Sequence, residues 1–531
     1  MDGGAAVLRE ASPWSLLGGA AAVLLLWWAA QVLEWAWLTP RRMERALRAQ
    51  GLRGTRYRFF WGDHKEERRL TAAALGKPVP MDRPHDILPR VSPLLHRAVQ
   101  EHGKISFTWF GTIPRITIID PELAREIMSN KDGYFLKSKL ATRTIRLLFG
   151  GVAILDGEKW VKHRRIMNPA FHAERLKGML PAFSAAYSDL ICKWENLLAD
   201  SAGTIELDVW SDFQNLSGDV ISRAAFGVSY QEGRKFFLLQ AEQLVLVTQA
   251  FRTSHIPGFF LLPTKNNRRI NAINRKTKTI LRGIIEKRHK AMKNGEPAKD
   301  DLLGMLLESN MNYSDSDGKS IKGITVEEVM EECKLFYFAG TETTAVLLTY
   351  TMVLLSMHPE WLDRARDEVL QVFGQNTPDL SGVSRLKVVS VTMVLYEVLR
   401  LYPPALFVNR RTHKKTEFGG VTYPADVMFV IPIMFIHRDP ELWGQDAGEF
   451  NPGRFAEGVS KACSDPGAFI PFSWGPRICI GQNFALLEVK LAISMILQRF
   501  AFELSPEYVH APCSILTIHP QHSVLVRMRR L

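Results

Sequence analysis

The chain has few cysteines, and they show no pairing pattern. Five occur in 531 residues, and none is part of a C-x-x-C motif. They stand far apart, at Cys192, Cys333, Cys463, Cys479 and Cys513. An odd and scattered set argues against a disulfide framework and against a zinc site, and it indicates a reducing compartment.

Features that divide a chain or bind a dinucleotide are also missing. After about residue 60 there is no Pro-, Ser- or Gly-rich linker, no internal repeat and no low-complexity block, so one large domain over residues 61–531 is the better interpretation. No G-x-G-x-x-G fingerprint is apparent, so the chain has no evident flavin or NAD site of its own. With 46% hydrophobic and 23% charged residues, the composition is ordinary for a chain with a large core.

The formal net charge of the chain is +12 at pH 7. Lys and Arg residues are dispersed among helical charge patterns rather than gathered in a basic domain, which disfavours nucleic-acid binding. Most of these charges are expected on solvated faces. Two functional roles for the positive charge remain open: attraction to anionic membrane lipid, and an encounter surface for an acidic electron donor.

A long hydrophobic run near the N-terminus, residues 14–38, is broken only by Gln31 and Glu34. As a helix rising about 1.5 Å per residue, it can cross a hydrocarbon core about 30 Å thick. A cleaved signal peptide is the alternative, but the charged residues before the run, Asp2, Arg9 and Glu10, give no excess of positive charge, whereas arginines follow it at positions 41, 42, 45 and 48. We therefore expect a single transmembrane signal anchor at 14–38, a basic hinge segment at 39–60, and the main domain on the cytosolic side.

The hydrophobic pattern beyond the anchor predicts a mainly α fold with small β-sheets (α+β). Up to about residue 120 the chain is expected to be loop-rich, with strands at 105–110 and 116–119 around a turn at Gly111 and Pro114. From about residue 121 to 400, apolar residues recur every three to four positions, which predicts a succession of helices. Further strands are expected at 418–424 and 427–431, and a last long helix from about Gln482 to Arg499.

The most informative segment is the loop FSWGPRICIG at residues 472–481. Its glycines allow backbone angles that residues with a Cβ avoid, so the loop can fold tightly beneath a flat macrocycle while backbone N–H groups point at the sulfur. An adjoining helix N-terminus and a ferric ion would hold Cys479 as a thiolate, which can bind one axial face of a haem iron. The alternative is a buried, unreactive cysteine beside a helix start.

The spacing F-x-x-G-x-R-x-C-x-G resembles the ligand loop of the cytochrome P-450 haem-thiolate monooxygenases. Phe472, Gly475, Arg477, Cys479 and Gly481 are all in place. The resemblance covers essentially all of the chain beyond the anchor, with its motifs in the family's order. It implies the cytochrome P-450 fold and a haem b cofactor whose iron takes Cys479 as its axial ligand.

A long apolar stretch from about residue 325 to 357 predicts a buried helix. It is opened by a capping box, Thr325-x-x-Glu328, and closed before Pro359. Such a helix fits a position beside the haem if it takes part in the oxygen chemistry.

The centre of that stretch, AGTETT at residues 339–344, carries the candidate oxygen chemistry. Small Ala339 and Gly340 leave room for dioxygen, Thr343 can hydrogen-bond an oxygen ligand or water, and Glu342 can relay protons. The alternative is a Thr-rich packing seam whose hydroxyls bond back to the preceding turn. The stretch resembles the family's A/G-G-x-D/E-T-T signature, which implies that Glu342 and Thr343 are catalytic.

Glu397 and Arg400 stand three positions apart and share a helix face, so they can form an ion pair. An isolated E-x-x-R is common on surface helices, but FNPGRF at residues 450–455 resembles the family's second arginine motif. The resemblance implies that Glu397, Arg400 and Arg454 form a buried charge network that supports the haem loop as a scaffold. Gly453 stands where many relatives carry glutamate.

Haem would bring two propionates, which need cationic or hydrogen-bonding partners once they leave water. Trp160 and Arg164 lie on neighbouring turns of one helix, and WVKHR resembles the family's propionate helix. The resemblance adds Arg477 and Arg410 as partners, with Arg411 the less favoured neighbour. For each arginine the alternative is a plain surface charge.

Segments at 51–54, 331–340 and 482–487 look like the plant branch that contains secologanin synthase and several triterpenoid and gibberellin oxidases. That resemblance implies a hydrophobic, terpenoid-sized substrate. The family layout places the pocket at 136–155, just before Ala339, at 405–408 and at 514–516. The candidate substrate contacts are Phe338, Ala339, Ala405, Phe407 and Leu516.

The resemblance as a whole implies a single-pass enzyme of the endoplasmic reticulum membrane that inserts one atom of O2 into a C–H bond of a lipophilic small molecule. An NADPH-dependent flavoprotein reductase would deliver the electrons; membrane lipid is a further partner and nucleic acid is not. One rival is an oxygen-independent haem-thiolate isomerase or dehydratase, but such relatives alter the oxygen-side threonine and the cysteine loop. A second rival is a non-catalytic haem-binding membrane protein, which would not need Glu342 and Thr343 together.

Overall fold

The computed structural model describes residues 13–531 except 132, 138–144, 202, 228–229, 252, 254–255, 257, 295–300, 313–322 and 387–389. Helices dominate it, which confirms the predicted class. The helices are α1 Pro13–Leu33, α2 Thr39–Ala49, α3 His64–Leu75, α4 Leu88–Val91, α5 Pro93–His102, α6 Pro121–Ser129, α8 Gly157–Met167, α9 Ala173–Ala199, α10 Val209–Phe226, α11 Tyr230–Phe251, α12 Lys265–Lys293, α13 Leu302–Asn312, α14 Val326–Met357, α15 Pro359–Phe373, α16 Leu380–Arg385, α17 Ser390–Leu401, α18 Ile433–Ile436, α19 Pro440–Trp443 and α20 Gln482–Arg499.

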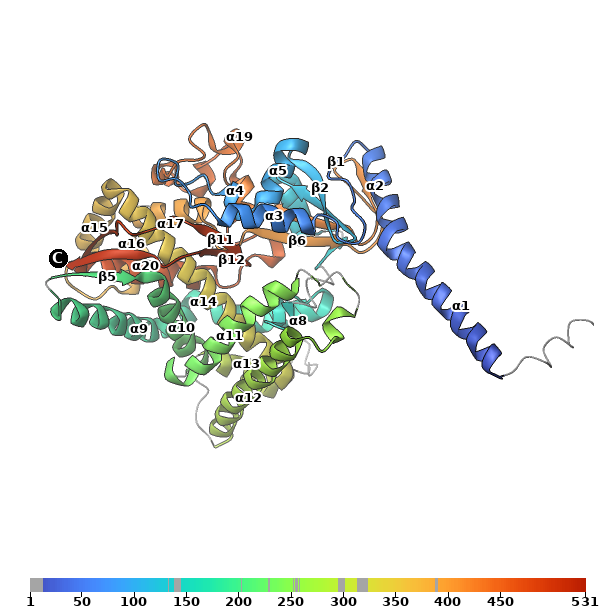
Figure 1. Cartoon of the computed structure of the whole chain (residues 1–531). Helices are drawn as coiled ribbons and strands as arrows, with labels where there is room; N and C mark the ends of the chain where they lie inside the picture. The colour runs from blue at the N-terminus through green and yellow to red at the C-terminus, as the bar shows by residue number, and fades with distance from the viewer. Residues whose placement is uncertain are drawn as a thin grey trace, which may run out of the picture.

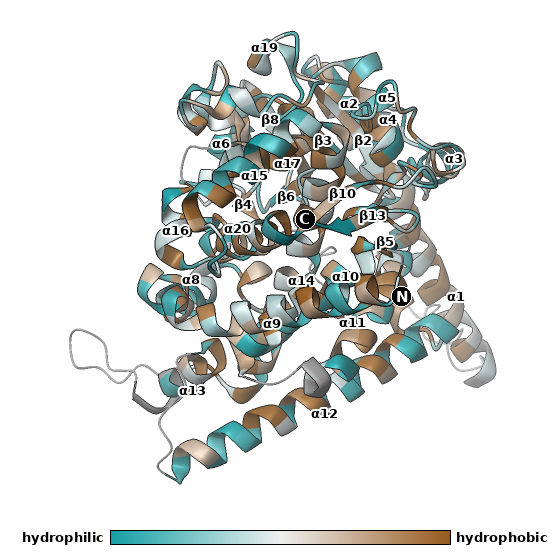
Figure 2. Cartoon of the chain, turned by 90° about the vertical axis from the view of Figure 1, so that its left-hand side faces the viewer, coloured by the Kyte–Doolittle hydropathy of each residue, from teal (hydrophilic) through white to brown (hydrophobic). Residues whose placement is uncertain are grey.

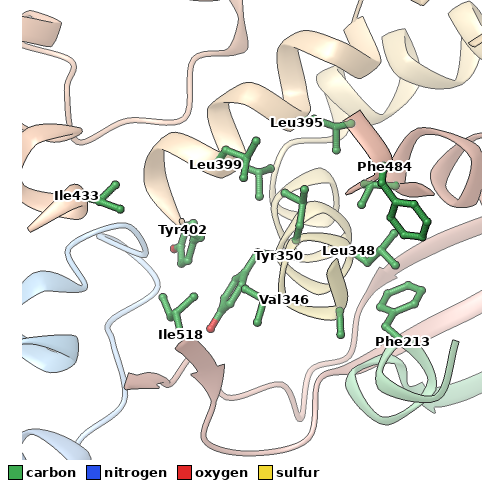
Figure 3. Packing of buried hydrophobic residues seen from close by; sticks show 14 of the residues in the cluster. Phe213, Val346, Leu348, Tyr350, Leu395, Leu399, Tyr402, Ile433, Phe484 and Ile518 are labelled. Carbon is green, nitrogen blue, oxygen red and sulfur yellow. The ribbon is translucent and has the colours of Figure 1, made fainter. Parts of the chain in front are cut away.

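Helix α14 runs through the middle of the domain (Figure 1). Its start is the predicted capping box: the Thr325 hydroxyl accepts from the Glu328 N–H at 3.2 Å, and the Glu328 carboxylate accepts from the Thr325 N–H at 2.8 Å. The helix is buried along most of its length because α10, α17 and α20 pack around it. Figure 3 shows this core, with side chains that include Phe213, Val346, Leu348, Tyr350, Leu399 and Phe484.

Helices at the edge of the domain bury only one face. Along α12, hydrophilic and hydrophobic positions alternate (Figure 2). Its buried residues recur every three or four positions, as the helical pattern predicts: Asn267, Ile270, Ile273, Thr277, Leu281 and Ile285.

The strands form one six-stranded sheet of order β1-β2-β3-β9-β6-β4, one three-stranded sheet of order β10-β13-β5, and the pairs β11-β12 and β7-β8. The large sheet is mixed: β2 and β3 are antiparallel, whereas β3 and β9 are parallel. The strands are β1 Arg53–Gly54, β2 Ile105–Phe110, β3 Ile113–Ile118, β4 Phe135–Leu136, β5 Thr204–Asp208, β6 Phe407–Thr412, β7 Thr416–Phe418, β8 Val421–Tyr423, β9 Met428–Pro432, β10 Phe500–Leu504, β11 Pro512–Ile515, β12 Thr517–Pro520 and β13 Leu525–Arg530.

Two predictions for the N-terminal part are wrong. The region up to residue 120 is not loop-rich, because it contains α2, α3, α4 and α5. Three of these helices carry proline in their first turn, where the missing N–H costs nothing, so these prolines mark helix starts rather than loops. Pro114 belongs to β3 rather than to the turn. It is tolerated because the pairing of β3 with β9 begins only at Arg115.

Later strands also differ from the prediction. Residues 418–424 do not form one strand but part of the hairpin of β7 and β8, because Gly419 and Gly420 adopt φ of +56° and +73° and turn the chain. The succession of helices between 121 and 400 is interrupted by β4 and β5. Strand β5 is stabilised by pairing with β13 near the C-terminus, a partner that local sequence cannot reveal.

Helix α1 extends away from the rest of the chain (Figure 1). The stretch Leu16–Ala49 is long and apolar enough to cross a membrane, and none of its most apolar window is buried. Helix α14 passes the same test of length and composition, but 72% of its window is buried, as befits a core helix. An exposed apolar helix at the N-terminus fits a membrane anchor.

The segment at residues 39–60 packs onto the domain. Leu47 is fully buried, Gly54 pairs with Phe107 of β2, and the Tyr57 hydroxyl donates to the Ala36 carbonyl. The end of the apolar run is thus tied to the domain by direct contacts.

Candidate functional site

Cys479 lies in a tight loop between the short turn Gly475–Arg477 and the start of α20. Its backbone N–H donates to the Phe472 carbonyl at 2.9 Å, which closes the loop. Gly475 has a φ of +72°, and a Cβ there would meet the backbone of Ser129 at 3.1 Å. The loop shape and its close approach to α6 therefore both require glycine at this position.

The Cys479 side chain is accessible, in contrast to the buried Cys333 and Cys513. The surrounding protein desolvates the thiol and raises its pKa. A hydrogen bond from the Gly481 backbone and the charge of Arg164 act in the opposite direction and favour the thiolate. Cys479 is thus open to an external ligand, and one backbone donor and one nearby positive charge stabilise its ionised form.

Cationic side chains from four separate segments converge beside this loop. The Arg477 guanidinium lies 4.6 Å from the Trp160 ring centroid and donates to Asp156 at 2.7 Å. Arg164, on α8 with Trp160, donates to the Ile478 carbonyl at 2.9 Å. Burial and the charge of Arg477 lower the pKa of Arg410 to about 10. Burial, Arg410 and Arg477 also hold the pKa of Lys137 well below its usual range.

This cluster has more positive charge than its protein partners neutralise. Among the described residues, no carboxylate lies within ion-pair distance of Arg410 or Lys137, and Asp156 pairs directly with Arg477 alone. Buried cations without counter-charges are costly. Two propionates would supply the missing negative charge, so the residues present fit a haem that Cys479 and this cluster would hold.

Arg410 and Arg411 are neighbours on β6, so their side chains point to opposite faces of the sheet and meet different partners. Arg411 donates to Asp426 at 2.8 Å and to the Lys137 carbonyl at 3.2 Å, so its charge already has a partner. Arg410 is 2% exposed, and the nearby charge of Arg477 helps to lower its pKa. The geometry thus favours Arg410 over Arg411 as a partner for an anion.

One face in the middle of α14 is not covered by protein. Phe338, Ala339, Gly340 and Thr343 are partly exposed, while the residues around them are buried. The Thr343 hydroxyl donates to the Ala339 carbonyl at 2.6 Å, the back-bonded geometry of the packing alternative. Gly340 has a packing reason of its own, since a Cβ there would lie 2.8 Å from the Ile221 side chain of α10.

Glu342 contacts a residue that the sequence did not single out. Its Oε2 lies 3.0 Å from His519 Nε2 on β12. The His519 ring packs edge-on against Trp210, with 5.2 Å between centroids. Trp210 and Pro520 line an open surface hollow of about 710 Å³. His519 is buried and thus contacts Glu342 on one side and Trp210, a residue that lines this hollow, on the other.

A second, smaller apolar cluster is separate from the main core. It is built from Leu148, Leu244, Val247 and Ile270, with Phe338, Ile515 and Leu516 packed against it. The Phe338 ring stacks on Phe149 at 5.0 Å. Leu516 forms the tip between β11 and β12 with a φ of +72°, a strained conformation for a side chain of this size. Two of the predicted substrate residues, Phe338 and Leu516, thus meet in one apolar region.

The other predicted pocket positions are less closely associated with this cluster. Ala405 forms a β-bridge with Thr517, next to Leu516. Phe407 opens β6, is 41% exposed and belongs to neither apolar cluster of the described residues. Part of the predicted segment 136–155, residues 138–144, lies outside the described residues.

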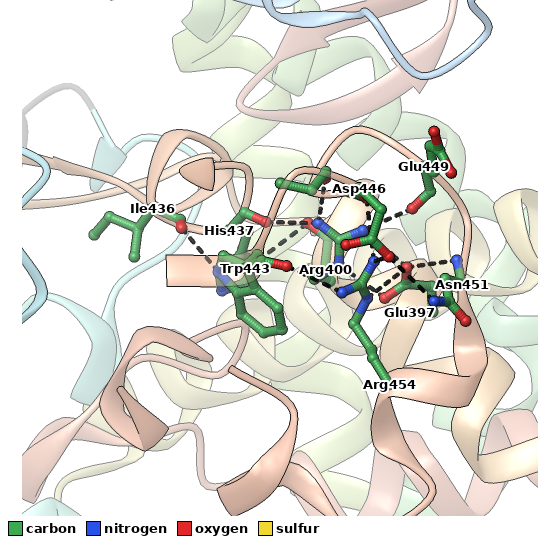
Figure 4. Close-up of polar contacts among 10 residues, drawn as sticks. Glu397, Arg400, Ile436, His437, Trp443, Asp446, Glu449, Asn451 and Arg454 are labelled. Atoms are coloured by element: carbon green, nitrogen blue, oxygen red, sulfur yellow. Dashed lines mark hydrogen bonds and ion pairs between the residues drawn. The ribbon is translucent and has the colours of Figure 1, made fainter. Parts of the chain in front are cut away.

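Glu397, Arg400 and Arg454 form a buried network (Figure 4). Arg400 Nε and Nη2 donate to the Glu397 carboxylate at 2.7 and 2.8 Å, and Arg454 Nε donates to it at 3.2 Å. Glu397 and Arg400 are fully buried. Arg454 also donates to Asp446 at 2.8 Å, so it has a second carboxylate although residue 453 is glycine.

Fold and site together define a mainly helical protein with an accessible cysteine, Cys479, beside a cationic cluster suited to a haem. The family model for Cytochrome P450 matches residues 91–525. Cytochrome P450 CYP72A616 of Paris polyphylla is 56% identical over 517 residues, which cover 97% of this chain and 98% of that protein. Secologanin synthase 1 of Catharanthus roseus is 49% identical over 505 residues, 95% of each chain. The chain belongs to the cytochrome P450 family, which implies a haem-thiolate iron cofactor and monooxygenase activity, and these relatives come from plants.

Sequence reasoning missed Lys137, Asp156 and His519. Lys137 and Asp156 lie in loops without a recognisable motif, and their contacts depend on Arg410 and Arg477, which are hundreds of residues away. His519 stands in a strand, where alternation gives its face but not its partner.

Proposed function

We propose that the chain is a monooxygenase of the endoplasmic reticulum membrane that oxidises a C–H bond of a lipophilic, terpenoid-sized molecule. The N-terminal helix anchors it by a single pass, residues 39–60 lie beside the membrane, and the domain from residue 61 onward faces the cytosol. The arginines that follow the apolar run support this orientation. An NADPH-dependent flavoprotein reductase delivers the electrons.

One observation carries the proposal: an accessible cysteine lies beside a cluster in which Lys137, Arg410 and Arg477 share a single carboxylate, Asp156. When bound, the haem-thiolate supplies the activation of dioxygen and the cleavage of its O–O bond. In the proposed assignment Cys479 holds the iron, and Phe472 and Gly481 shape its loop. The propionates would be held by Lys137, Trp160, Arg164, Arg410 and Arg477.

The oxygen side of the site would use α14. The Thr343 hydroxyl can turn from the Ala339 carbonyl toward a reacting oxygen and donate its proton there. Glu342 can pass a proton toward that hydroxyl and regain one through His519. The Glu397, Arg400 and Arg454 network serves as scaffold.

The substrate proposal rests on the apolar cluster around Phe338 and Leu516. Its hydrophobic side chains come from the 145–149 segment, α11, α12, α14 and the β11-β12 hairpin, and the buried Gln243 of α11 beside them donates to the Leu147 carbonyl. Such a region excludes water and binds a lipophilic molecule by burial rather than by charge. The names of two relatives, secologanin synthases 1 and 2, are consistent with a terpenoid-sized ligand.

The test combines a spectrum with turnover. The microsomal protein should give the CO spectrum of a ferrous haem-thiolate, and with reductase, NADPH and a terpenoid panel it should form an oxygenated product that carries one atom from labelled O2. A thiolate spectrum with conversion of hydroperoxides and no use of NADPH would instead assign an isomerase or dehydratase. The spectrum without any turnover would assign a non-catalytic haem protein.

A further inference from the structure

A buried histidine, His437, contacts Arg400 of the Glu397–Arg400–Arg454 network (Figure 4), and its ring also contacts Ile470 in the chain that enters the cysteine loop. It is fully buried. Its backbone carbonyl accepts from Arg400 Nη1 at 2.8 Å, and its ring Nδ1 lies 3.2 Å from the Arg400 carbonyl. On the other side, its Nε2 lies 3.0 Å from the Ile470 backbone nitrogen.

These contacts fix one protonation state of the ring. The Ile470 N–H can only donate, so Nε2 must be an acceptor and carry no proton. The Arg400 carbonyl can only accept, so Nδ1 must carry the proton. Burial and the nearby Arg400 charge agree with a neutral ring, because they lower the pKa of His437 to about 3. His437 is therefore a neutral imidazole in one tautomer with both nitrogens engaged.

The hydrogen bonds continue from Ile470 to the cysteine. The Ile470 carbonyl accepts from the Ser473 N–H at 3.0 Å, which forms the turn at the start of the loop. The neighbouring Phe472 carbonyl accepts from the Cys479 N–H at 2.9 Å. A short series of hydrogen bonds and neighbouring residues thus leads from the buried Arg400 through His437 to Cys479.

We propose that His437 is a positioning residue: its Nε2 fixes the Ile470 N–H, and with it the start of the cysteine loop, to the buried arginine network and so sets the position of the Cys479 sulfur. The inference rests on the proposed role of Cys479 as iron ligand. It gives the arginine network a defined connection to that ligand.

Packing is the competing explanation, because the His437 ring stacks on Phe469 with 5.5 Å between centroids. Three substitutions separate the two roles. His437→Gln can place an acceptor oxygen near the Nε2 position, whereas His437→Asn reaches only the Nδ1 position. His437→Phe keeps the ring and its stacking but has no acceptor. His85→Phe replaces another buried histidine, one bonded to Tyr402 and not to the loop, and serves as the matched control.

The experiment measures, within the haem-loaded fraction of the full-length protein, the ratio of the thiolate–CO band to the band of the inactive form without thiolate. Thermal unfolding is measured on the same samples. We expect His437→Asn and His437→Phe to lower the ratio about five-fold, the change that one lost buried hydrogen bond produces, while His437→Gln stays closer to wild type. His85→Phe should lower the thermal midpoint without changing the ratio.

The opposite order overturns the proposal. If His437→Phe keeps the wild-type ratio while Gln and Asn lose it equally, or if the ratio simply follows the thermal midpoint across all variants, His437 acts by packing alone. A wild-type protein without any thiolate–CO band would instead refute the proposed function itself, and the positioning role with it. The two failures are therefore distinguishable.

Discussion

Substitution of Glu397 tests whether the arginine network is scaffold or chemistry. Its Oε1 accepts from Arg400 Nη2, the Asn451 N–H and Arg454 Nε, and its Oε2 accepts from Arg400 Nε. In Glu397→Ala the Arg400 guanidinium keeps three backbone carbonyls as acceptors but loses its counter-charge in a fully buried place. Breaking a buried pair in this way costs about 3–5 kcal/mol, a large fraction of the stability of a typical domain.

Glu397→Gln should destabilise the protein less than Glu397→Ala does. An amide oxygen at the Oε1 position retains three of the acceptor contacts, while the amide nitrogen meets Arg400 Nε as a second donor and the charge is lost. Glu457→Ala, at an exposed glutamate, is the control and should change stability by no more than about 0.5 kcal/mol. The assay follows haem content after expression and the thermal midpoint of the haem absorbance. We expect haem content and the thermal midpoint to fall most in Glu397→Ala, less in Glu397→Gln and least in Glu457→Ala. Normal haem content and midpoint in Glu397→Ala, with slower turnover alone, would refute the scaffold role.

Three further outcomes follow from the site and the anchor. Thr343→Ala should keep haem and substrate binding, but product formed per NADPH should fall and hydrogen peroxide should rise; an unchanged ratio would make Thr343 a packing residue. Arg410→Leu removes a buried charge that faces Arg477, so it should stabilise the haem-free protein and weaken haem retention; equal effects on the thermal midpoints of both forms would place Arg410 outside the site. Deletion of residues 1–38 should give a haem-binding protein that is more easily extracted from membranes, and lumenal glycosylation of a reporter fused to Leu531 would contradict the proposed orientation.

Elements with complete local signals could be predicted from the sequence. The capping box at Thr325 and the apolar run after it define α14, and α20 has the predicted bounds, from Gln482 to Arg499. The order of the large sheet could not be predicted. Strands β3 and β9 are parallel neighbours about 300 residues apart, and the pairing depends on how the helices between them pack.

The same distinction holds for the site. Cys479 and Glu342 stand in dense local motifs, so sequence alone pointed to both. Lys137 and His519 act through contacts with distant segments, and nothing in their own neighbourhood identifies them. The sequence suggested that Gly340 leaves room for dioxygen. The structure adds a second reason for glycine there, because a Cβ would collide with the Ile221 side chain.

The most direct test of the account is the reduced CO spectrum of the full-length protein and its cysteine variants. The account predicts a thiolate–CO band in the wild type that is lost in Cys479→Ala and in Cys479→His, because no other cysteine lies in a glycine-flanked loop beside the cationic cluster. Serine substitutions at the remaining cysteines should each retain the band: Cys192, Cys333, Cys463 and Cys513. A thiolate–CO band that persists in Cys479→Ala would contradict the account, because the iron ligand would then lie elsewhere in the chain.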